Sequence, residues 1–200
     1  MFHDIAIYIV DKIGDLGYIG IFLLMFLESS FFPFPSEVVM IPAGYLASKG
    51  EMNIYLALLF GVLGSLTGAL FNYYLALYFG RSFLLRYGKY IFLNPESLLK
   101  LESFFEKHGE ISTFNGRLIP GVRQYISFPA GLAKMNVLKF SLYTSFGAFL
   151  WMVVLVIIGY FIGAEQTLVD KYLNIAAITV LIFATFLTLT YIFFYKRNSK

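Results

Sequence analysis

The chain has 200 residues, of which 59% are hydrophobic and only 14% are charged, and its formal net charge is +3. Soluble domains average roughly 45–50% apolar and about 25% charged residues, so the composition excludes an ordinary soluble protein. The chain has no cysteine, and its two histidines form no zinc-type or di-iron-type motif. We therefore expect no metal, no cofactor and no nucleic-acid partner. Without a visible nucleophile–base pair, we also expect no catalytic residues and no enzymatic activity.

The first predicted element is a hairpin made of two short apolar runs. Residues 16–27 end at Glu28, and residues 38–48 follow Glu37. Each run is shorter than the about 20 apolar residues that cross a bilayer, and the two prolines between them break any continuous helix. Residues 16–48 are therefore predicted to form a re-entrant hairpin, which enters and leaves by one face of the membrane.

Three longer uncharged stretches are predicted to be transmembrane helices: residues 54–80, 140–164 and 172–195. On the first of them, Gly64 and Gly68 are spaced so that a neighbouring helix can approach closely. Asn72 and Tyr74 on the same helix, with Arg81 just beyond it, are candidates for lining a polar path. Packing or the aromatic belt at the interface is the alternative role for such residues.

Residues 81–110, between the first two spans, form the most polar part of the chain. Asn94-Pro95 is a typical helix start, and His108-Gly109 is a typical helix end. Between them, apolar side chains recur on one face and charged side chains lie largely elsewhere. We expect an amphipathic helix that lies on the membrane surface.

Residues 111–133 are predicted to form a second re-entrant hairpin, because turn signals interrupt an apolar sequence there. The two hairpins resemble each other, since Pro42-Ala43-Gly44 recurs as Pro129-Ala130-Gly131 at an offset of 87. Beyond a four-residue difference in loop length, an offset of 83 maps Met52-Asn53 onto Met135-Asn136. An internal duplication explains these matches, and chance identity in a chain of low complexity is the alternative.

The predicted fold is thus a single all-α polytopic membrane domain, residues 1–200. It contains two hairpin-plus-helix repeats of inverted orientation, an interfacial helix between them and an extra C-terminal span. In this topology three basic residues fall on one face: Lys12, Lys49 and Lys171. Ten fall on the other: Arg81, Arg86, Lys89, Lys100, Lys107, Lys134, Lys139, Lys196, Arg197 and Lys200. The positive-inside rule therefore predicts a cytoplasmic C-terminus.

Four charges, Glu28, Glu37, Arg117 and Arg123, are predicted to lie within the membrane. Each costs on the order of 3 kcal/mol at mid-membrane, and two acids opposite two bases reduce that cost. Guanidinium groups bind phosphate through paired hydrogen bonds. A carboxylate in surroundings of low polarity takes up a proton more readily than it does in water. The pattern predicts a site that binds an anion and exchanges a proton, as in secondary transporters. A purely structural ion-pair cluster is the alternative.

Three signatures resemble the DedA family of bacterial membrane proteins, which shares its core domain with eukaryotic VTT, or SNARE-associated Golgi, proteins. The first is Phe26-Leu27-Glu28 with Pro33-x-Pro35-Ser36-Glu37. The second is Tyr78-Phe79-Gly80-Arg81 with Arg86-Tyr87-Gly88-Lys89-Tyr90. The third and most specific is Phe114-Asn115-Gly116-Arg117-Leu118-Ile119-Pro120-Gly121-Val122-Arg123 with Pro129-Ala130-Gly131. The three signatures follow one another in the same order as in the family, and together they cover about residues 17–163.

The resemblance implies a lipid transporter or flippase of the bacterial inner membrane that depends on the proton-motive force. Undecaprenyl phosphate and phosphatidylethanolamine are the substrates that it suggests. It implies that Arg117 and Arg123 bind the substrate phosphate, while Glu28 and Glu37 couple protons. The chain departs from the family pattern at Glu37, where many members have Asp after Pro-Gly. The expected partners are membrane lipids and protons, with a homo-oligomer left open. An ion/proton antiporter and a non-transporting membrane organiser are the alternative functions.

Overall fold

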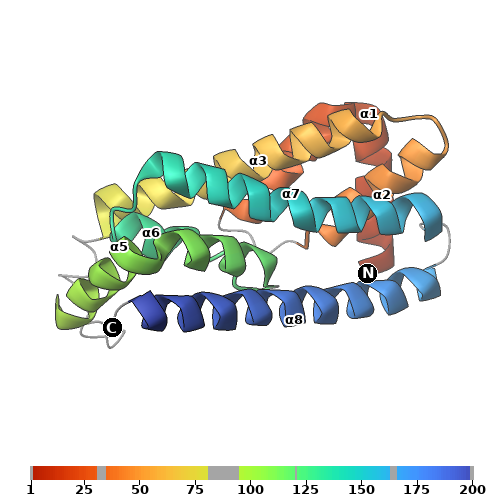
Figure 1. The fold of residues 1–200 in the computed structure, drawn as a ribbon. Helices are drawn as coiled ribbons and strands as arrows, with labels where there is room; N and C mark the ends of the chain where they lie inside the picture. The colour runs from red at the N-terminus through yellow and green to blue at the C-terminus, as the bar shows by residue number, and fades with distance from the viewer. Residues whose placement is uncertain (1, 31–34, 81–94, 120, 163–165, 199–200) are drawn as a thin grey trace.

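The computed structural model describes residues 2–30, 35–80, 95–119, 121–162 and 166–198. Within these ranges every regular element is a helix (Figure 1). Three helical stretches are long and apolar enough to cross a bilayer: Ile54–Gly80, Val137–Ile162 and Lys171–Phe193. The predicted all-α class and the three predicted spans are confirmed. Residues 81–94 of the predicted interfacial segment, which include Arg81, lie outside the described residues.

Two helices precede the first span, and the first of them is short only beyond a kink. Helix α1 (Phe2–Ser29) is kinked at Gly17, whose φ of 56° and ψ of −135° suit a residue without a Cβ. Beyond the kink, the apolar stretch Leu16–Ser29 is too short to span a bilayer, and so is α2 (Glu37–Ser48). The part of α1 beyond the kink and helix α2 correspond to the two apolar arms predicted from the sequence, whereas the part of α1 before the kink was not predicted.

The two long central helices, α3 (Ile54–Leu75) and α7 (Val137–Ile162), lie side by side (Figure 1). Both begin at an asparagine cap. The side-chain oxygen of Asn53 accepts hydrogen bonds from the second and third amides of α3 at 2.9 and 3.2 Å. Asn136 does the same for α7 at 3.0 and 3.2 Å, satisfying amides that have no partner within the helix. Helix α3 ends in a π-helical turn, η1 (Ala76–Gly80).

Helix α5 (Pro95–Leu118) corrects one prediction. We expected a helix end at His108-Gly109, but α5 continues through both residues to Leu118. Gly109 is a packing position, because a Cβ there would lie 3.1 Å from the Sδ of Met135. The predicted surface helix and the first arm of the second predicted hairpin are thus one continuous element. The short helix α6 (Ser127–Leu132) follows after a turn.

Glycines hold the short helices against the long ones. At Gly64 and Gly68 of α3, a Cβ would overlap carbonyl oxygens of α1, so the predicted packing role of these two residues is confirmed. At Gly44 of α2, a Cβ would overlap the carbonyl of Val156 on α7, and Gly131 of α6 lies as closely on α3. Such contacts bring backbones together and leave little room for water.

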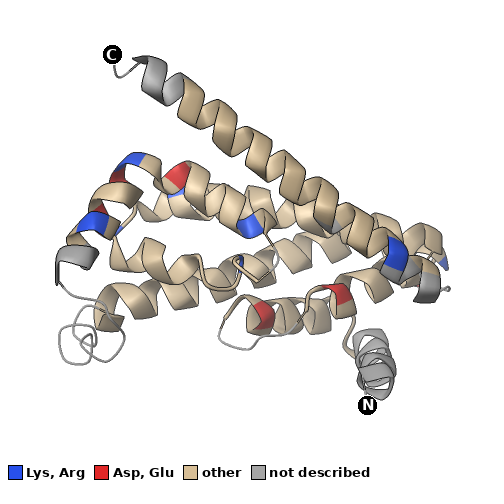
Figure 2. Cartoon of the chain, turned by 90° about the horizontal axis from the view of Figure 1, so that it is seen from below, with Lys and Arg blue, Asp and Glu red and all other residues tan. Residues whose placement is uncertain are grey.

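Helix α8 (Gln166–Asn198) lies at the edge of the molecule and crosses the other helices at an angle (Figure 2). It is attached to α5 by polar contacts: Asn115 Nδ2 donates to Thr188 Oγ1 at 2.6 Å, and His108 Nδ1 lies 3.0 Å from the hydroxyl of Tyr191. Large apolar side chains cover its outer side, as expected of a helix that faces lipid: Ile178, Ile182, Phe186, Leu189 and Phe193.

Candidate functional site

The two candidate acids stand at the ends of the short helices. Glu28 is the last residue but one of α1, and Glu37 is the first residue of α2. Glu28 is only 2% exposed, whereas the side chain of Glu37 is 23% exposed. The buried acid therefore needs a partner inside the protein, since an isolated buried charge is strongly disfavoured.

Arg123, in the turn between α5 and α6, supplies that partner. Its Nε lies 3.1 Å from Glu28 Oε1, and its Nη2 lies 3.6 Å from Glu37 Oε1. The Nε makes no aligned hydrogen bond, so the contact to Glu28 is an ion pair by proximity. Arg123 also lies over the ring of Trp151 on α7, 5.6 Å from its centroid, a favourable position for a cation. One guanidinium thus joins α1, α2 and α7, and the predicted meeting of the acids with an arginine is confirmed.

Arg117, one residue before the end of α5, is placed differently. Its side chain is buried, at 3% exposure, and it donates to Ser29 Oγ at 3.4 Å and to Ser127 Oγ at 3.2 Å. Among the described residues, no carboxylate oxygen lies within 4.0 Å of this guanidinium, and its Nε has no hydrogen-bond partner. The guanidinium of Arg117 is therefore in direct contact with serine hydroxyls and not with a carboxylate.

A cavity of only about 10 Å³ lies between these groups. Such a volume holds at most one water molecule, so a phosphate group does not fit. The cavity is lined by Met25, Glu28, Ser36, Ser65, Arg117, Arg123, Ala148, Trp151 and Met152.

Serine hydroxyls connect the charges, and the sequence reasoning missed them. Ser29 Oγ donates to Glu28 Oε2 at 2.7 Å and lies 2.6 Å from Ser65 Oγ. Ser36 accepts a hydrogen bond from Trp151 Nε1 at 3.3 Å. A signal was present, because serines directly flank both acids in otherwise apolar sequence. Buried hydroxyls need partners, so serines beside buried acids are candidates for the same network.

The three predicted path-lining residues have different positions. Asn72 is buried beside the site, where its Nδ2 donates to the carbonyl oxygens of Ser29 and Ser30 at 3.2 and 2.9 Å. It thereby satisfies carbonyls at the end of α1 that have no helical partner. Tyr74 is 40% exposed and stacks on Tyr78, away from the small cavity. Arg81 lies outside the described residues.

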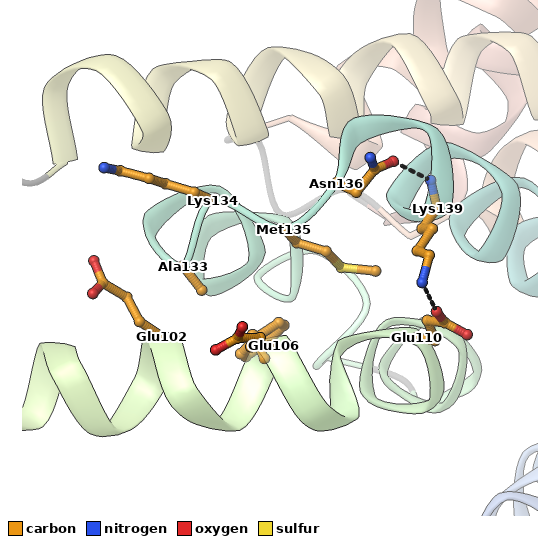
Figure 3. Close-up of a pocket in the computed structure, with 9 residues that line it drawn as sticks. Glu102, Glu106, Glu110, Ala133, Lys134, Met135, Asn136 and Lys139 are labelled. Atoms are coloured by element: carbon orange, nitrogen blue, oxygen red, sulfur yellow. Dashed lines mark hydrogen bonds and ion pairs between the residues drawn. The ribbon is translucent and has the colours of Figure 1, made fainter.

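A larger cleft of about 560 Å³ lies elsewhere, between α5 and the connection from α6 to α7 (Figure 3). Its walls carry charges of opposite sign: Glu102, Glu106 and Glu110 on α5 against Lys134 and Lys139. Lys139 Nζ lies 2.6 Å from Glu110 Oε1, and this hydrogen bond, followed by that of the Tyr143 hydroxyl, lowers the pKa of Glu110. In the part of the chain that the structure describes, no three His, Asp or Glu side chains gather as metal ligands would.

Fold and site together define the class of protein. Its described residues form only helices, three of them long and apolar enough to span a membrane, and they enclose a buried cluster of opposite charges. Residues 34–161, more than half of the chain, match the VTT domain. The chain therefore belongs to the VTT-domain, or DedA, family of membrane proteins, as the sequence signatures predicted.

Three curated relatives illustrate the similarity. The uncharacterized membrane protein YkoX of Bacillus subtilis is 40% identical over 195 residues, which cover 96% of this chain and 85% of the relative. Undecaprenyl phosphate transporter A of the same organism is 31% identical over 191 residues, covering 96% and 94%. Protein DedA of Escherichia coli is 29% identical over 182 residues, covering 84% and 80%. No solved structure gives a significant match.

Proposed function

We propose that this protein is a lipid transporter of the bacterial inner membrane that moves a phosphate-bearing lipid, either undecaprenyl phosphate or a phospholipid such as phosphatidylethanolamine. Relatives from Bacillus subtilis and Staphylococcus aureus, 31% and 29% identical, carry the name undecaprenyl phosphate transporter A. The observation that carries the proposal is that the two acids do not pair equally with the two arginines. Both acids pair with Arg123, so Arg117 is left without a carboxylate and can accept an anionic head group.

Proton coupling follows from the same geometry. Glu28 and Glu37 hold Arg123 at 3.1 and 3.6 Å while both are ionised. Protonating them weakens their attraction for Arg123, so that Arg123 joins Arg117 in binding the phosphate. Loss of the protons restores the ion pairs and favours release of the head group. Proton and phosphate occupancy are then linked, each favouring the other.

Access to the site requires movement of the short helices. The cavity of about 10 Å³ is far smaller than a phosphate group. In the proposed mechanism, the two predicted re-entrant hairpins, residues 16–48 and 111–133, separate enough to admit the head group while the acyl or prenyl chain stays in the bilayer.

Contacts between the helices support the proposed inverted duplication. Gly44 of α2 lies on the Val156 carbonyl of α7, and Gly131 of α6 lies on the Tyr73 carbonyl of α3. Gly44 and Gly131 differ by the sequence offset of 87, and Tyr73 and Val156 differ by the offset of 83. Each contact is therefore the image of the other under the duplication. In this arrangement the second short helix of each repeat packs on the long helix of the other repeat. The two repeats then meet around a shared site, as in transporters built from inverted repeats.

The proposed orientation places the C-terminus in the cytoplasm, supported by ten basic residues on that face against three on the other. Because the chain has no cysteine, single cysteines can be introduced and labelled in intact cells with an impermeant thiol reagent. We expect labelling at position 51 and none at position 200. The reverse pattern would overturn the orientation.

Reconstitution into vesicles tests the transport proposal. Labelled undecaprenyl phosphate and phosphatidylethanolamine are followed separately, with and without a pH gradient. We expect gradient-dependent movement of one lipid by the parent and by Glu110→Gln, which removes an exposed acid outside the site, but not by Arg117→Gln. Movement of neither lipid by folded parent protein would favour a membrane organiser, and ion exchange without lipid movement would favour an antiporter.

A further inference from the structure

Ser29 lies between the proposed proton-binding group and the proposed anion-binding group. It is fully buried, at 0% exposure. Its Oγ donates to Glu28 Oε2 at 2.7 Å and accepts from Arg117 Nη1 at 3.4 Å. A third contact joins it to Ser65 Oγ at 2.6 Å. A serine hydroxyl has one proton to donate and two lone pairs to accept with. While Glu28 is ionised, the proton of Ser29 is committed to the carboxylate, and Ser65 and Arg117 use both lone pairs.

We propose that Ser29 is a further phosphate-binding residue, whose hydroxyl turns from Glu28 toward the substrate phosphate when Glu28 takes up a proton. This inference rests on the proposed function. Protonated Glu28 carries its own O–H, which can donate to Ser29 Oγ and reverse the 2.7 Å hydrogen bond once Arg117 turns its donor from Ser29 to the phosphate and frees a lone pair. The proton of Ser29 is then free to point at a phosphate oxygen held by Arg117. Glu28 gains one proton, Ser29 keeps its own, and no covalent bond to the lipid changes.

The neighbouring hydroxyls do not share this position. Ser30 Oγ donates to the Leu27 carbonyl of its own helix at 2.8 Å. Ser127 accepts from Arg117 Nη2 at 3.2 Å, and Ser65 bonds to Ser29. Among the described residues, Ser29 is therefore the hydroxyl that contacts both a buried acid and a buried arginine.

The position of Ser29 is fixed from two sides. Asn72 Nδ2 donates to its carbonyl oxygen at 3.2 Å. Gly68 of α3 lies so close that a Cβ added there would be 3.0 Å from the Cβ of Ser29. A hydroxyl held in this way can rotate about one bond without moving its backbone. Its direction is then set by which neighbours donate and which accept.

The charged groups around Glu28 come from three elements. Arg123 contacts it directly, Arg117 contacts it through Ser29, and Glu37 of α2 shares Arg123 with it. Helices α3 and α7 contribute no ionisable side chain to the lining of the small cavity. Among the described residues, Glu28 is therefore the carboxylate that lines the small cavity, and Ser29 contacts it.

Binding of a short-chain isoprenyl monophosphate at acidic and alkaline pH tests the proposal, with inorganic phosphate as a second probe. The single tryptophan of the chain, Trp151, lies 5.6 Å from Arg123 and reports binding by its fluorescence. For the parent we expect tighter binding at acidic pH. Ser29→Ala should lose about tenfold in affinity at acidic pH, the effect of one hydrogen bond to a charged group, and little at alkaline pH. Ser30→Ala, which removes a neighbouring hydroxyl outside the network, should bind like the parent.

The outcomes separate this inference from the proposed function. If Ser29→Ala keeps the parent's ratio of affinities at the two pH values, the role of Ser29 is overturned while phosphate binding stands. If the parent binds neither probe at either pH, both proposals fall. Should Ser29→Ala not fold, Ser29→Cys replaces it, because its thiol has nearly the same size and is a weak donor. Parent-like pH dependence in Ser29→Cys would then overturn the inference.

Discussion

Replacing Arg123 by glutamine should destabilise the protein strongly and in a way that depends on Glu28. Glu28 is 2% exposed and loses its cation at 3.1 Å, while Glu37 loses its cation at 3.6 Å. Breaking a buried ion pair by removing one partner costs about 3–5 kcal/mol, because the other charge stays buried without compensation. Glu28→Gln alone should cost about 1–2 kcal/mol, since Arg123 keeps Glu37 and the new amide can still accept from Ser29.

The double variant separates pairing from general damage. Two glutamines form a neutral pair, so the combined loss should fall below the sum of the single losses by about 2 kcal/mol. The free energy of unfolding of the four proteins is measured by reversible denaturation in mixed micelles at neutral pH. Losses that simply add would refute the reasoning, because they would mean that Arg123 stabilises the fold independently of Glu28.

Glu110 and Lys139 provide a matched control for this experiment. Their charged atoms are closer, at 2.6 Å, but their side chains are 43% and 58% exposed. Water screens an exposed pair, so we expect little coupling despite the shorter distance. The lowered pKa of Glu110 means that any stability it contributes is present above the ordinary carboxyl pKa and is lost as the pH falls through the lowered value. Stronger coupling here than at Glu28 would mean that distance, and not burial, sets the strength of these pairs.

Three further substitutions test separate parts of the proposal. Arg117→Lys keeps the charge but loses the planar pair of donors, so the affinity for the monophosphate probe should fall about tenfold with the fold intact, as followed by Trp151 fluorescence. Glu28→Gln imitates the protonated acid, so vesicle assays should show lipid transport that no longer responds to a pH gradient. Gly44→Leu would force α2 away from α7, so its thermal unfolding should shift to clearly lower temperature, whereas an unchanged transition would contradict the packing.

The sequence predicted the elements whose signals are local. Uncharged stretches of sufficient length predicted the three spans, and the short runs beside Glu28 and Glu37 predicted the second part of α1 and helix α2. The end of α5 was predicted wrongly, because a glycine after a basic residue is also compatible with a helix that packs closely on a neighbour. Gly109 could be recognised as such a position only once Met135, 26 residues further along, was placed against it.

The gathering of the four charges was predictable, but the way they share partners was not. Charge balance alone indicated only that two acids and two arginines reduce the cost of each other's charge. In the structure, both acids contact Arg123, and Arg117 bonds to serines. Which acid contacts which arginine depends on where α5 ends and on how α1 packs on α3 at Gly68. These are tertiary contacts, and no local sequence pattern predicts them.

Electroneutrality of the site leads to a prediction about the substrate. With both acids ionised, the charges of Glu28, Glu37, Arg117 and Arg123 sum to zero. A phosphate monoester adds about 1.5 to 2 negative charges at neutral pH, whereas phosphatidylethanolamine, whose ammonium group offsets its phosphodiester, adds no net charge. Because a net charge in surroundings of low polarity is costly, each negative charge that enters should be accompanied by about one proton. We therefore expect close to two protons per molecule for a polyprenyl monophosphate and close to none for phosphatidylethanolamine. Proton uptake and lipid movement measured in the same vesicles give this ratio, and a ratio that stays the same for both lipid classes would refute neutralisation at the two acids.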